Sequence, residues 1–352
     1  MISCGLPFES NFPYIVTQYA KENRIPISLT IEITPFCNFS CLMCYVRLTP
    51  EQAKEQGELL TKEQILHIAQ QAKNMGTLYL TLTGGEPLSR PDFWEIYAEL
   101  NKMGFLISIL TNGYLIDESA IEKFKEYGMP YYVKLTLYGA SNETYNKVCG
   151  CNNGFTKIEK AVKLLKENKV PVNLSGTMVK KNAEDIAEMY KAAREWGIPF
   201  QHTVSVVKSA RGSVNNIEKS RFLFDEFVDK LTLEQLEKHK LPECKTPFAW
   251  CASYKSSAWL TWNGHLQLCA FMNGPYSLIS DGFENAWKQL NEKLEALKTP
   301  EECKDCKYID FCQRCPGLLC AESGSAEKVS SSVCDTAKKL YYAYMRLKGA
   351  RE

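Results

Sequence analysis

Hydrophobic and polar positions follow two alternating periods from about residue 27 to residue 241. Short runs rich in β-branched and aromatic residues predict strands, and stretches in which apolar residues recur every three or four positions predict amphipathic helices. The predicted strands are 27–34, 78–83, 106–111, 132–138, 172–179 and 200–207, and the predicted helices are 61–75, 91–103, 117–127, 154–168, 183–196 and 217–239. Such strand–helix units in series predict a parallel sheet with right-handed crossovers.

Two architectures satisfy this order, an open doubly wound sheet and an incomplete barrel, and the period alone does not separate them. In both, ligands bind at the edge where the parallel strands end. Capping residues agree with the predicted boundaries, because Thr61 and Gln64 form a capping-box pattern and Asp117 is a suitable N-cap.

The chain changes character after about residue 241. Nine cysteines lie between Cys244 and Cys334, helical periodicity is weak, and Gly, Pro and Ser are frequent. A region with so little apolar core is expected to fold around metal. We therefore divide the chain into an N-terminal extension (1–26), a main α/β domain (27–241), a cysteine-rich domain (242–335) and a C-terminal helix (336–352). The extension is too short for an independent peptide-binding domain.

Composition excludes several classes of protein. Lys and Arg number 42 against 41 Asp and Glu, which argues against nucleic acid or an anionic membrane as partner. No run of 18 apolar residues and no signal-peptide pattern is present, so we expect a cytoplasmic protein without a membrane span. In that reducing compartment, 15 cysteines indicate metal ligands rather than disulfides.

The most informative motif is Cys37-x3-Cys41-x2-Cys44, in the loop after the first predicted strand. Cubane [4Fe–4S] clusters normally take four thiolates, so three leave one iron open for chemistry. The alternative is structural zinc, which usually requires a second Cys pair or histidines. The next such residues along the chain are His67 and Cys149, so we favour iron and sulfur.

Further motifs lie at the ends of the second and third predicted strands, Gly84-Gly85-Glu86-Pro87 and Leu110-Thr111-Asn112-Gly113. Together with the cysteine loop they resemble the radical S-adenosylmethionine (radical SAM) superfamily. The resemblance implies a partial (β/α)6 barrel whose three loop cysteines hold a [4Fe–4S] cluster. S-adenosylmethionine (SAM) would chelate the open iron and be cleaved reductively to a 5′-deoxyadenosyl radical.

The resemblance also implies which residues contact SAM. Gly84, Gly85 and Glu86 would bind its amino group, and glycines there would let the backbone approach the ligand without a Cβ. Met43 stands where the family often has an aromatic residue near adenine, and Tyr45 follows the last cysteine. The full predicted set of contacts is Met43, Tyr45, Gly84, Gly85, Glu86, Thr111, Asn112, Thr136 and Thr177.

The later cysteines, taken by spacing alone, suit zinc and iron–sulfur sites equally. Given the motifs upstream, they resemble a SPASM extension, a small, loop-rich domain that holds two auxiliary [4Fe–4S] clusters. One cluster would take Cys244, Cys251 and Cys269 with either Cys315 or Cys320, and we favour Cys315. The other would take Cys303, Cys306, Cys312 and Cys334. The resemblance spans about residues 27–335.

Cys149 and Cys151 remain, in the loop after the fourth predicted strand. A thiol at this edge could donate a hydrogen atom to a substrate radical. The simpler interpretation, which we favour, is two small side chains of an ordinary loop.

SPASM-bearing enzymes most often modify peptides or proteins by thioether or carbon–carbon crosslinking, epimerisation or formylglycine formation. The last is disfavoured, because sulfatase maturases carry Asp where this chain has Ala270. We expect an electron donor of flavodoxin or ferredoxin type. A peptide leader would be held by the barrel, the C-terminal region or a separate protein. Two alternatives stay open: a radical SAM enzyme acting on a small molecule, and a non-catalytic metal-binding or electron-transfer protein.

Overall fold

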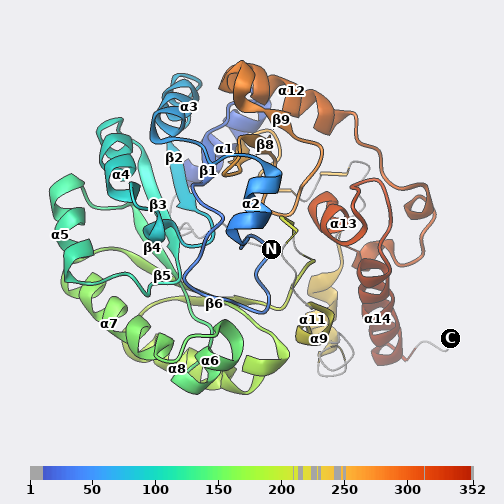
Figure 1. The fold of residues 1–352 in the computed structure, drawn as a ribbon. Helices are drawn as coiled ribbons and strands as arrows, with labels where there is room; N and C mark the ends of the chain where they lie inside the picture. The colour runs from blue at the N-terminus through green and yellow to red at the C-terminus, as the bar shows by residue number, and fades with distance from the viewer. Residues whose placement is uncertain are drawn as a thin grey trace.

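The computed structural model describes residues 11–208, 210–212, 217–222, 228, 231–241, 247–248, 251–312 and 314–349. An arc of strands carries helices around its outer side (Figure 1). The strands are β1 (Ser28–Glu32), β2 (Tyr79–Thr83), β3 (Leu106–Thr111), β4 (Tyr132–Thr136), β5 (Val172–Thr177), β6 (Phe200–Thr203), β7 (Ser257–Leu260), β8 (His265–Gln267) and β9 (Ser277–Leu278).

The helices alternate with the strands along the chain. The α-helices are α1 (Asn11–Glu22), α2 (Pro50–Gln56), α3 (Lys62–Asn74), α4 (Phe93–Lys102), α5 (Glu118–Tyr127), α6 (Asn142–Cys149), α7 (Gly154–Glu167), α8 (Ile186–Trp196), α9 (Ile217–Ser220), α11 (Leu233–His239), α12 (Phe283–Glu295), α13 (Pro316–Ser323) and α14 (Ser331–Leu347). Short 3-10 helices are η1 (Pro87–Ser89), η2 (Lys180–Asp185), η3 (Ile279–Asp281), η4 (Glu301–Cys303) and η5 (Ile309–Phe311).

Within the described residues the strands form one sheet in the order β6-β5-β4-β3-β2-β1-β7-β8-β9. The pairs from β6 through β1 to β7 are parallel, and β8 pairs antiparallel with both β7 and β9. The sheet is not closed, since β6 and β9 are its two ends. The predicted series of parallel units and the partial barrel are therefore confirmed.

Four features differ from the sequence-based expectation. The first is α6, which ends at Cys149 within the segment expected to be a loop. β7 to β9 come from the cysteine-rich region, yet β7 pairs with β1, so the sheet runs across the predicted boundary at 241/242. α12 and α13 also lie in that region, where the helical pattern is weak. The prediction of one helix over 217–239 is wrong: α9 ends at Ser220, α11 begins at Leu233, and residues 221–222 and 231–232 are not helical.

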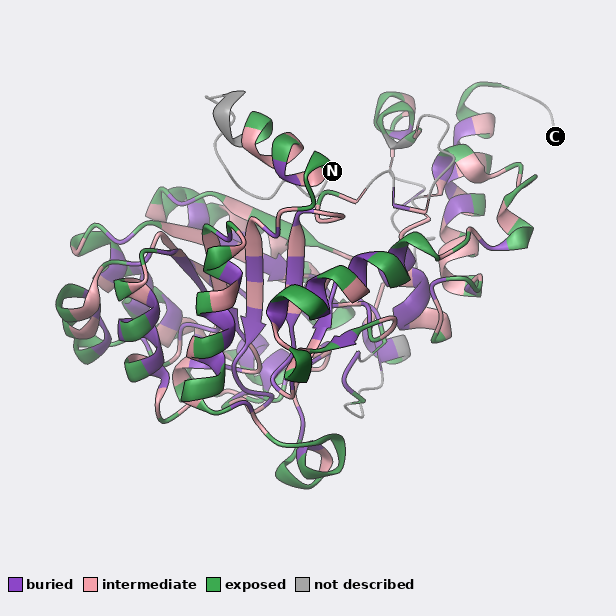
Figure 2. Cartoon of the chain, turned by 90° about the horizontal axis from the view of Figure 1, so that it is seen from above, coloured by how far each residue is buried: buried purple, intermediate pink, exposed green. Residues whose placement is uncertain are grey.

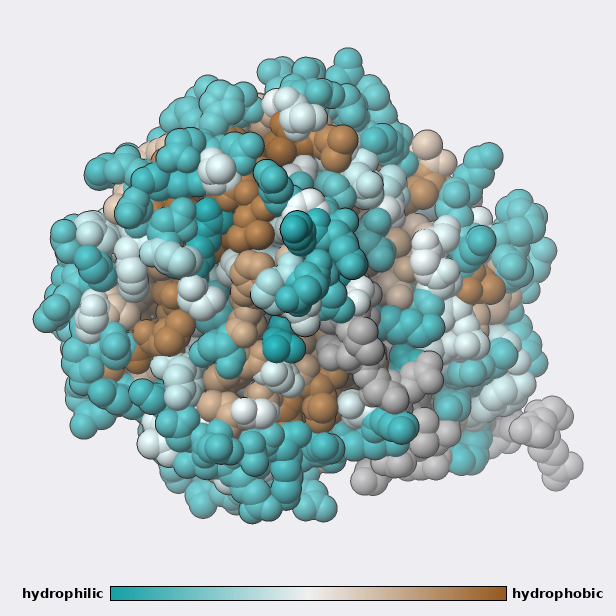
Figure 3. All heavy atoms as spheres, viewed as in Figure 1, coloured by the Kyte–Doolittle hydropathy of each residue, from teal (hydrophilic) through white to brown (hydrophobic). Residues whose placement is uncertain are grey.

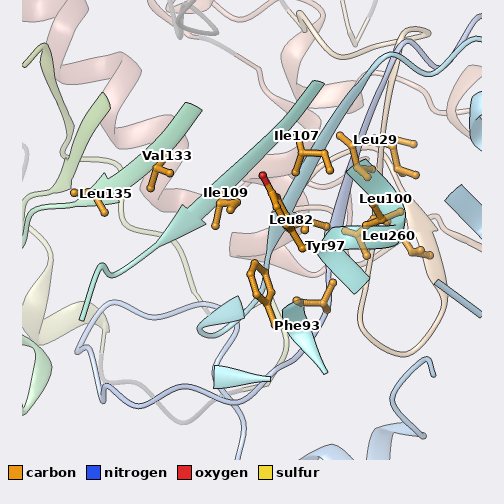
Figure 4. Close-up of a cluster of buried hydrophobic side chains, with 14 of the residues drawn as sticks. Leu29, Leu82, Phe93, Tyr97, Leu100, Ile107, Ile109, Val133, Leu135 and Leu260 are labelled. Carbon is orange, nitrogen blue, oxygen red and sulfur yellow. The ribbon is translucent and has the colours of Figure 1, made fainter. Parts of the chain in front are cut away.

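The core lies between the outer face of the strands and the helices. Leu29, Ile31 and Leu82 are fully buried on that face, whereas Thr30 and Thr81 on the opposite face are partly exposed. Figure 2 shows the same division, with buried residues along the strands and exposed ones on the outer sides of the helices. Figure 4 labels members of this core from the strands and α4, namely Leu29, Leu82, Phe93, Tyr97, Leu100, Ile107, Ile109, Val133, Leu135 and Leu260. The inner face of β1 and β2 therefore carries polar side chains that could contact a ligand.

Capping residues fix where helices of the strand–helix units begin. Thr61 and Gln64 form the predicted capping box: the Gln64 amide donates to the Thr61 hydroxyl at 3.2 Å, and the Thr61 amide donates to the Gln64 side chain at 2.8 Å. Asp117 caps α5 by accepting from the Ala120 amide at 3.0 Å. The loops after β1–β6 therefore gather at one edge of the sheet, as parallel strands require. No helix in the described part of the chain is long and apolar enough to cross a membrane.

Candidate functional site

The three-cysteine loop leaves β1 at the carboxyl edge of the sheet and ends where α2 begins. Cys41 is buried, and Cys37 and Cys44 are partly exposed. The Cys44 amide donates to the Cys41 carbonyl at 3.2 Å, which folds the second half of the motif into a turn. All three predicted ligands are therefore brought onto one short loop.

The turn after β2 fastens this loop from one side. The Gly85 amide donates to the Thr34 carbonyl at 2.8 Å, and the Glu86 amide donates to the Phe36 carbonyl at 2.9 Å. A Cβ on Gly84 would lie 2.2 Å from the Thr34 oxygen, and one on Gly85 would lie 2.2 Å from the Phe36 oxygen. The glycines are thus needed because two backbone segments meet. Sequence reasoning assigned them to close approach of a ligand, which this packing does not require.

Glu86 joins the ends of β2 and β3. One carboxylate oxygen accepts from the Leu88 amide at 3.0 Å and the Thr111 hydroxyl at 2.7 Å, and the other accepts from the Asn112 amide at 2.8 Å. The side chain is fully buried, and this burial raises the pKa of Glu86 to about 7 despite the three donors. Glu86 and Thr111 therefore hold the turn after β2 against the end of β3.

Asn112 connects the third strand to the cysteine loop. Its side-chain amide donates to Asn38 Oδ1 at 2.7 Å and lies 3.7 Å from Cys37 Sγ, within reach of a weak hydrogen bond to sulfur. The Phe39 amide donates to the same sulfur at 3.4 Å. Burial is the main cause that raises the pKa of Cys37. A deprotonated Cys37 is therefore favoured only when a positive partner such as a metal is present.

Cys41 differs from its neighbours. The pKa of Cys41 lies below its ordinary value, chiefly because of hydrogen bonding with the Cys149 side chain and despite burial, which acts in the opposite direction. Beside this contact, the Ser40 amide donates to the Cys149 carbonyl at 2.8 Å and the Leu42 amide donates to the Val148 carbonyl at 3.0 Å. The end of α6 therefore supports the loop from a second side.

The two thiols predicted as hydrogen donors occupy different surroundings. Cys149 is fully buried, behind the cysteine loop, where no substrate can reach it in this conformation. Cys151 is partly exposed, and its sulfur lies 3.6 Å from Asn153 Oδ1. If either thiol serves as a donor, the geometry is more suitable at Cys151.

Thr136 and Thr177 end β4 and β5 on the inner face of the sheet. Thr136 lies opposite Ser175, and Thr177 lies opposite Thr203. Their neighbours Leu135 and Leu174 are buried on the outer face, so the threonine side chains point the other way. This edge is polar and partly exposed, as the sequence predicts for a binding surface. In the view of Figure 3, hydrophobic residues lie in the middle of the molecule and hydrophilic ones dominate its rim.

Met43 and Tyr45, the predicted contacts near adenine, both pack against other parts of the chain. Met43 is 7% exposed and belongs to the hydrophobic core. The Tyr45 ring lies 5.6 Å from the Phe271 ring in an edge-to-face contact, and burial raises the pKa of Tyr45 above its usual range. Tyr45 therefore links the cysteine loop to the C-terminal region.

A buried ion pair spans the open side of the barrel. Arg211, from the segment after β6, donates to the two carboxylate oxygens of Glu32 in β1 at 2.6 and 3.2 Å. Trp259 in β7 donates to the same carboxylate at 2.7 Å. Sequence reasoning missed this cluster, although a charged residue at the end of an otherwise hydrophobic strand was a usable signal. It joins the segment after β6 to the paired strands β1 and β7.

The structure brings Cys251, Cys269 and Cys315 together. Burial first, then the charges of Cys315 and Cys251, raise the pKa of Cys269 to about 12. A Cβ on Gly317 would lie 3.1 Å from Cys269 Sγ and 3.7 Å from Cys315 Sγ, so a glycine keeps the space between these sulfurs open. Cys244, the predicted fourth member, lies outside the described residues.

Cys320, the other candidate for this group, is directed elsewhere. Its thiol donates to Asn273 Oδ1 at 3.0 Å and to the Gly274 carbonyl at 3.3 Å, and it is 2% exposed. Burial raises its pKa, and no other cysteine contributes to that shift. The geometry therefore favours Cys315 over Cys320.

The cysteines predicted to hold the second auxiliary cluster also lie near one another. Burial first, then the charges of Cys312, Cys334 and Cys306, raise the pKa of Cys303 to about 11. Across the described residues, however, no three His, Cys, Asp or Glu side chains are close enough together to hold one metal ion. Zinc draws its ligands onto a single ion, whereas a cubane spreads its thiolates over different irons.

The sequence model of the Radical SAM superfamily matches residues 31–193, which contain the three-cysteine loop and the turns after β2 and β3. Residues 31–193 therefore form a radical SAM domain. This domain runs from within β1 to within α8, and the C-terminal cysteine groups lie beyond it.

Two characterised relatives are similar to this chain. The AdoMet-dependent heme synthase of Methanosarcina barkeri is 29% identical over 187 residues, which is 53% of this chain and 52% of that protein. The chain thus spans about half of that relative's length. The antilisterial bacteriocin subtilosin biosynthesis protein AlbA of Bacillus subtilis is 26% identical over 322 residues, covering 86% of this chain and 69% of AlbA.

A solved structure shares the fold. Streptococcus suis SuiB bound to S-adenosylmethionine superposes with a TM-score of 0.64 at 19% identity, over 94% of this chain and 84% of SuiB. SuiB bound to its precursor peptide SuiA gives a TM-score of 0.63 at 19% identity, over 94% of this chain and 82% of that one. The shared region includes the C-terminal part as well as the barrel.

Proposed function

We propose that this chain is a radical SAM enzyme that modifies a peptide or protein, with a SAM-binding [4Fe–4S] cluster on Cys37, Cys41 and Cys44. The observation that carries the proposal is the loop itself, which places three cysteines at the carboxyl edge of the sheet. Backbone hydrogen bonds to the turn after β2 and to the end of α6 hold this loop in position. The donor set is all thiol, which fits an iron–sulfur cluster. When bound, cluster and SAM supply a 5′-deoxyadenosyl radical that removes hydrogen from an unactivated carbon.

The chain's own residues have distinct tasks in this proposal. Glu86 positions the turns after β2 and β3 through its buried hydrogen bonds. Asn112, Thr136 and Thr177 would offer polar groups to SAM at the carboxyl edge of the sheet. Gly84 and Gly85 keep the cysteine loop close to β2.

We further propose two auxiliary [4Fe–4S] clusters in a SPASM domain. One would use Cys251, Cys269 and Cys315 with Cys244, and the other Cys303, Cys306, Cys312 and Cys334. The space kept open by Gly317 between two of the sulfurs supports the first cluster. The charges of neighbouring cysteines, which contribute to raising the pKa values of Cys303, Cys312 and Cys334, support the second. The clusters would pass electrons between the barrel and a donor protein of flavodoxin or ferredoxin type.

A peptide substrate is supported by two likenesses. AlbA, named for biosynthesis of a bacteriocin, aligns with 86% of this chain, and SuiB has a structure with its precursor peptide and the same fold. We propose a ribosomally made peptide processed in the cytoplasm, with its leader held by this chain or by a separate protein. Crosslinking and epimerisation are the reactions that this class most often performs.

The first experiment is anaerobic reconstitution with iron and sulfide, followed by SAM and dithionite. We expect 5′-deoxyadenosine by mass spectrometry and about twelve irons per chain, four for each cubane. About four irons with deoxyadenosine would remove the auxiliary clusters and leave the core. No deoxyadenosine from a fully loaded protein would overturn the enzymatic assignment.

Matched variants assign each site. Cys37→Ala should remove SAM cleavage and about four irons, whereas Cys312→Ala should remove about four irons and retain SAM cleavage. Cys320→Ala is the control and should keep the full iron content.

The substrate class is tested by co-expression with a precursor peptide encoded nearby. A mass change in the peptide that disappears with Cys37→Ala would support peptide modification. An unmodified peptide beside an enzyme that consumes SAM only with a small molecule would favour the small-molecule alternative.

A further inference from the structure

β4 carries a lysine on the inner face of the barrel. Lys134 lies between Val133 and Leu135, which are fully buried in the core on the outer face (Figure 4). Successive side chains of a strand point to opposite faces, so Lys134 lies on the inner face. It is partly exposed, and Thr136 ends β4 two positions later, at the carboxyl edge. At about 3.3 Å per residue, Lys134 therefore lies roughly 7 Å deeper in the barrel than this edge.

The charge of Lys134 is not balanced within the described part of the chain. Among the described strand residues on the inner face of β1 to β7, the other charged residue is Glu32. Its carboxylate is fully buried and accepts from Arg211 and Trp259, and β2 and β3 separate β1 from β4. The Lys134 ammonium makes no ion pair or hydrogen bond with any described residue. An anion bound beside this ammonium would be held more strongly than in bulk water.

A second polar side chain lies next to Lys134. Asn173 of β5 pairs with Lys134 in the parallel register, so the two residues share the inner face. Asn173 is partly exposed, and its side-chain amide makes no hydrogen bond with the residues that the structure describes. Neighbouring strands lie about 4.8 Å apart, so an ammonium and an amide on them can donate to the same small group. Two adjacent donors, one of them charged, are complementary to a carboxylate.

We infer that Lys134 and Asn173 form a carboxylate-binding pair and that the substrate presents an acidic group to the inner face of the barrel. This group would be an Asp or Glu side chain or a C-terminal carboxylate. The inference rests on the proposed function and narrows its substrate class. SAM also has a carboxylate, but Thr136 and Thr177, proposed above to contact SAM, lie at the edge, whereas this pair lies below it.

The binding test labels lysines of the full chain, with all clusters reconstituted anaerobically and SAM added without reductant. Sulfosuccinimidyl acetate acylates free lysine amines, and mass spectrometry of proteolytic fragments gives the labelling rate of each lysine. N-acetylglutamate is the probe, and N-acetylglutamine is the matched control without the charge. N-acetylglutamate should slow the labelling of Lys134 in a saturable way, and N-acetylglutamine should not. Lys181 on η2 is exposed and serves as the internal reference, with one rate in all samples.

The variant test measures KM for the precursor peptide encoded nearby. Lys134→Met should raise this KM by roughly tenfold to a hundredfold, the effect of losing a hydrogen bond to a charged group. Lys134→Arg keeps the charge and should retain most of the affinity, and Asn173→Leu should have a smaller effect than Lys134→Met. Lys181→Met is the control and should keep the wild-type KM.

The acidic group of the peptide is located by replacing its carboxylates with amides one at a time. At one position the amide should raise KM as much as Lys134→Met does. Combining that amide with Lys134→Met should raise KM no further, because the two changes remove the same interaction. Independent, multiplying effects at every position would contradict a direct contact with Lys134.

The outcomes separate the inference from the function on which it rests. Equal labelling rates with both probes, or an unchanged KM in Lys134→Met, would overturn the inference and keep the proposed function. Protection of Lys134 by SAM alone, with a matching loss of SAM affinity in Lys134→Met, would assign the carboxylate to SAM and also overturn the inference. A wild-type chain that forms no 5′-deoxyadenosine would overturn the proposed function, whereas the labelling of Lys134 is measured without turnover.

Discussion

The cysteines of the barrel and those of the C-terminal region are held in different ways. The barrel loop is fixed by bonds to distant segments, such as Gly85 to Thr34 and Ser40 to Cys149. The bonds around Cys303, Cys312 and Cys334 are local: their amides donate to carbonyls three or four residues earlier, at 3.0, 3.0 and 2.9 Å. The sheet thus prepares the first site, whereas the backbone bonds of these three cysteines are local turns. We therefore expect the second site to depend more on metal for its order than the first does.

The largest expected effect follows from removing iron. Chelation under anaerobic conditions should reduce amide protection in residues 303–334 to the level of unfolded chain, because local turns alone do not hold this segment. Amides of β1 to β5 should keep their protection, since their pairing does not involve metal. Hydrogen exchange followed by mass spectrometry measures both regions in one sample. An equal loss of amide protection in β1 to β5 and in residues 303–334 would contradict the view that only the C-terminal site depends on metal for its order.

The next effect concerns the ion pair that joins the regions. Arg211→Met leaves the Glu32 carboxylate buried without its guanidinium, and unfolding in urea should show a loss of about 3–5 kcal/mol. The exposed pair of Arg24 and Glu295, at 2.7 Å, is the matched control, and Arg24→Met should cost at most about 1 kcal/mol. Similar losses in the two variants would mean that Arg211 is not a structural link.

A smaller effect within the barrel is the pH dependence contributed by Glu86. Its pKa is raised by burial from 4.5 to about 7, so its stabilisation is complete below pH 4.5 and is lost as the pH rises to about 7. Relative to Glu86→Gln, the wild-type protein should lose about 3 kcal/mol over that interval. Urea midpoints between pH 5 and pH 8 measure the difference.

Glu63 on α3 provides the control for this experiment. Its carboxylate is exposed, and hydrogen bonds from the backbone and Thr61 lower its pKa, so it stays ionised throughout the interval. Glu63→Gln should therefore follow the wild-type curve. A flat curve for the wild type would show that Glu86 is not protonated in the folded state.

The smallest expected effect is at Gly317. A Cβ there would press on Cys269 Sγ at 3.1 Å, so Gly317→Ala should weaken metal retention in that group by roughly tenfold. The rate of iron release to a chelator measures this. Leu318→Ala, at the next position of α13, is the control. If Gly317→Ala releases iron at the wild-type rate, the space between the sulfurs is not needed for a cluster.

The sequence predicted best where local patterns decide the structure. Strand and helix boundaries in the barrel agree with the pattern to within a few residues, because capping residues such as Thr61 and Asp117 act on their own neighbours. The helix expected over 217–239 is interrupted, since residues 221–222 and 231–232 are not helical. α12 is also missed, although its Phe283 and Trp287 are buried against the core.

Tertiary contacts explain the rest of the site. No spacing rule could place the Cys149 thiol against Cys41, since the two meet only after α6 has packed on the cysteine loop. The glycines after β2 have their reason in the backbone of Thr34 and Phe36, which the sequence does not connect to them. Spacing did favour Cys315, which lies with Cys251 and Cys269 in the fold.

The pairing of β1 with β7 has a consequence for synthesis of the protein. Thr30 lies opposite Trp259, so the two partners leave the ribosome far apart in time. At ordinary rates of about 5–20 residues per second, β1 waits on the order of 10–50 seconds for its second neighbour. During that interval one side of β1 presents unpaired backbone groups, which attract other chains. A nascent chain of this protein is therefore exposed to misassembly until the cysteine-rich region emerges, and chaperone protection matters most before that point.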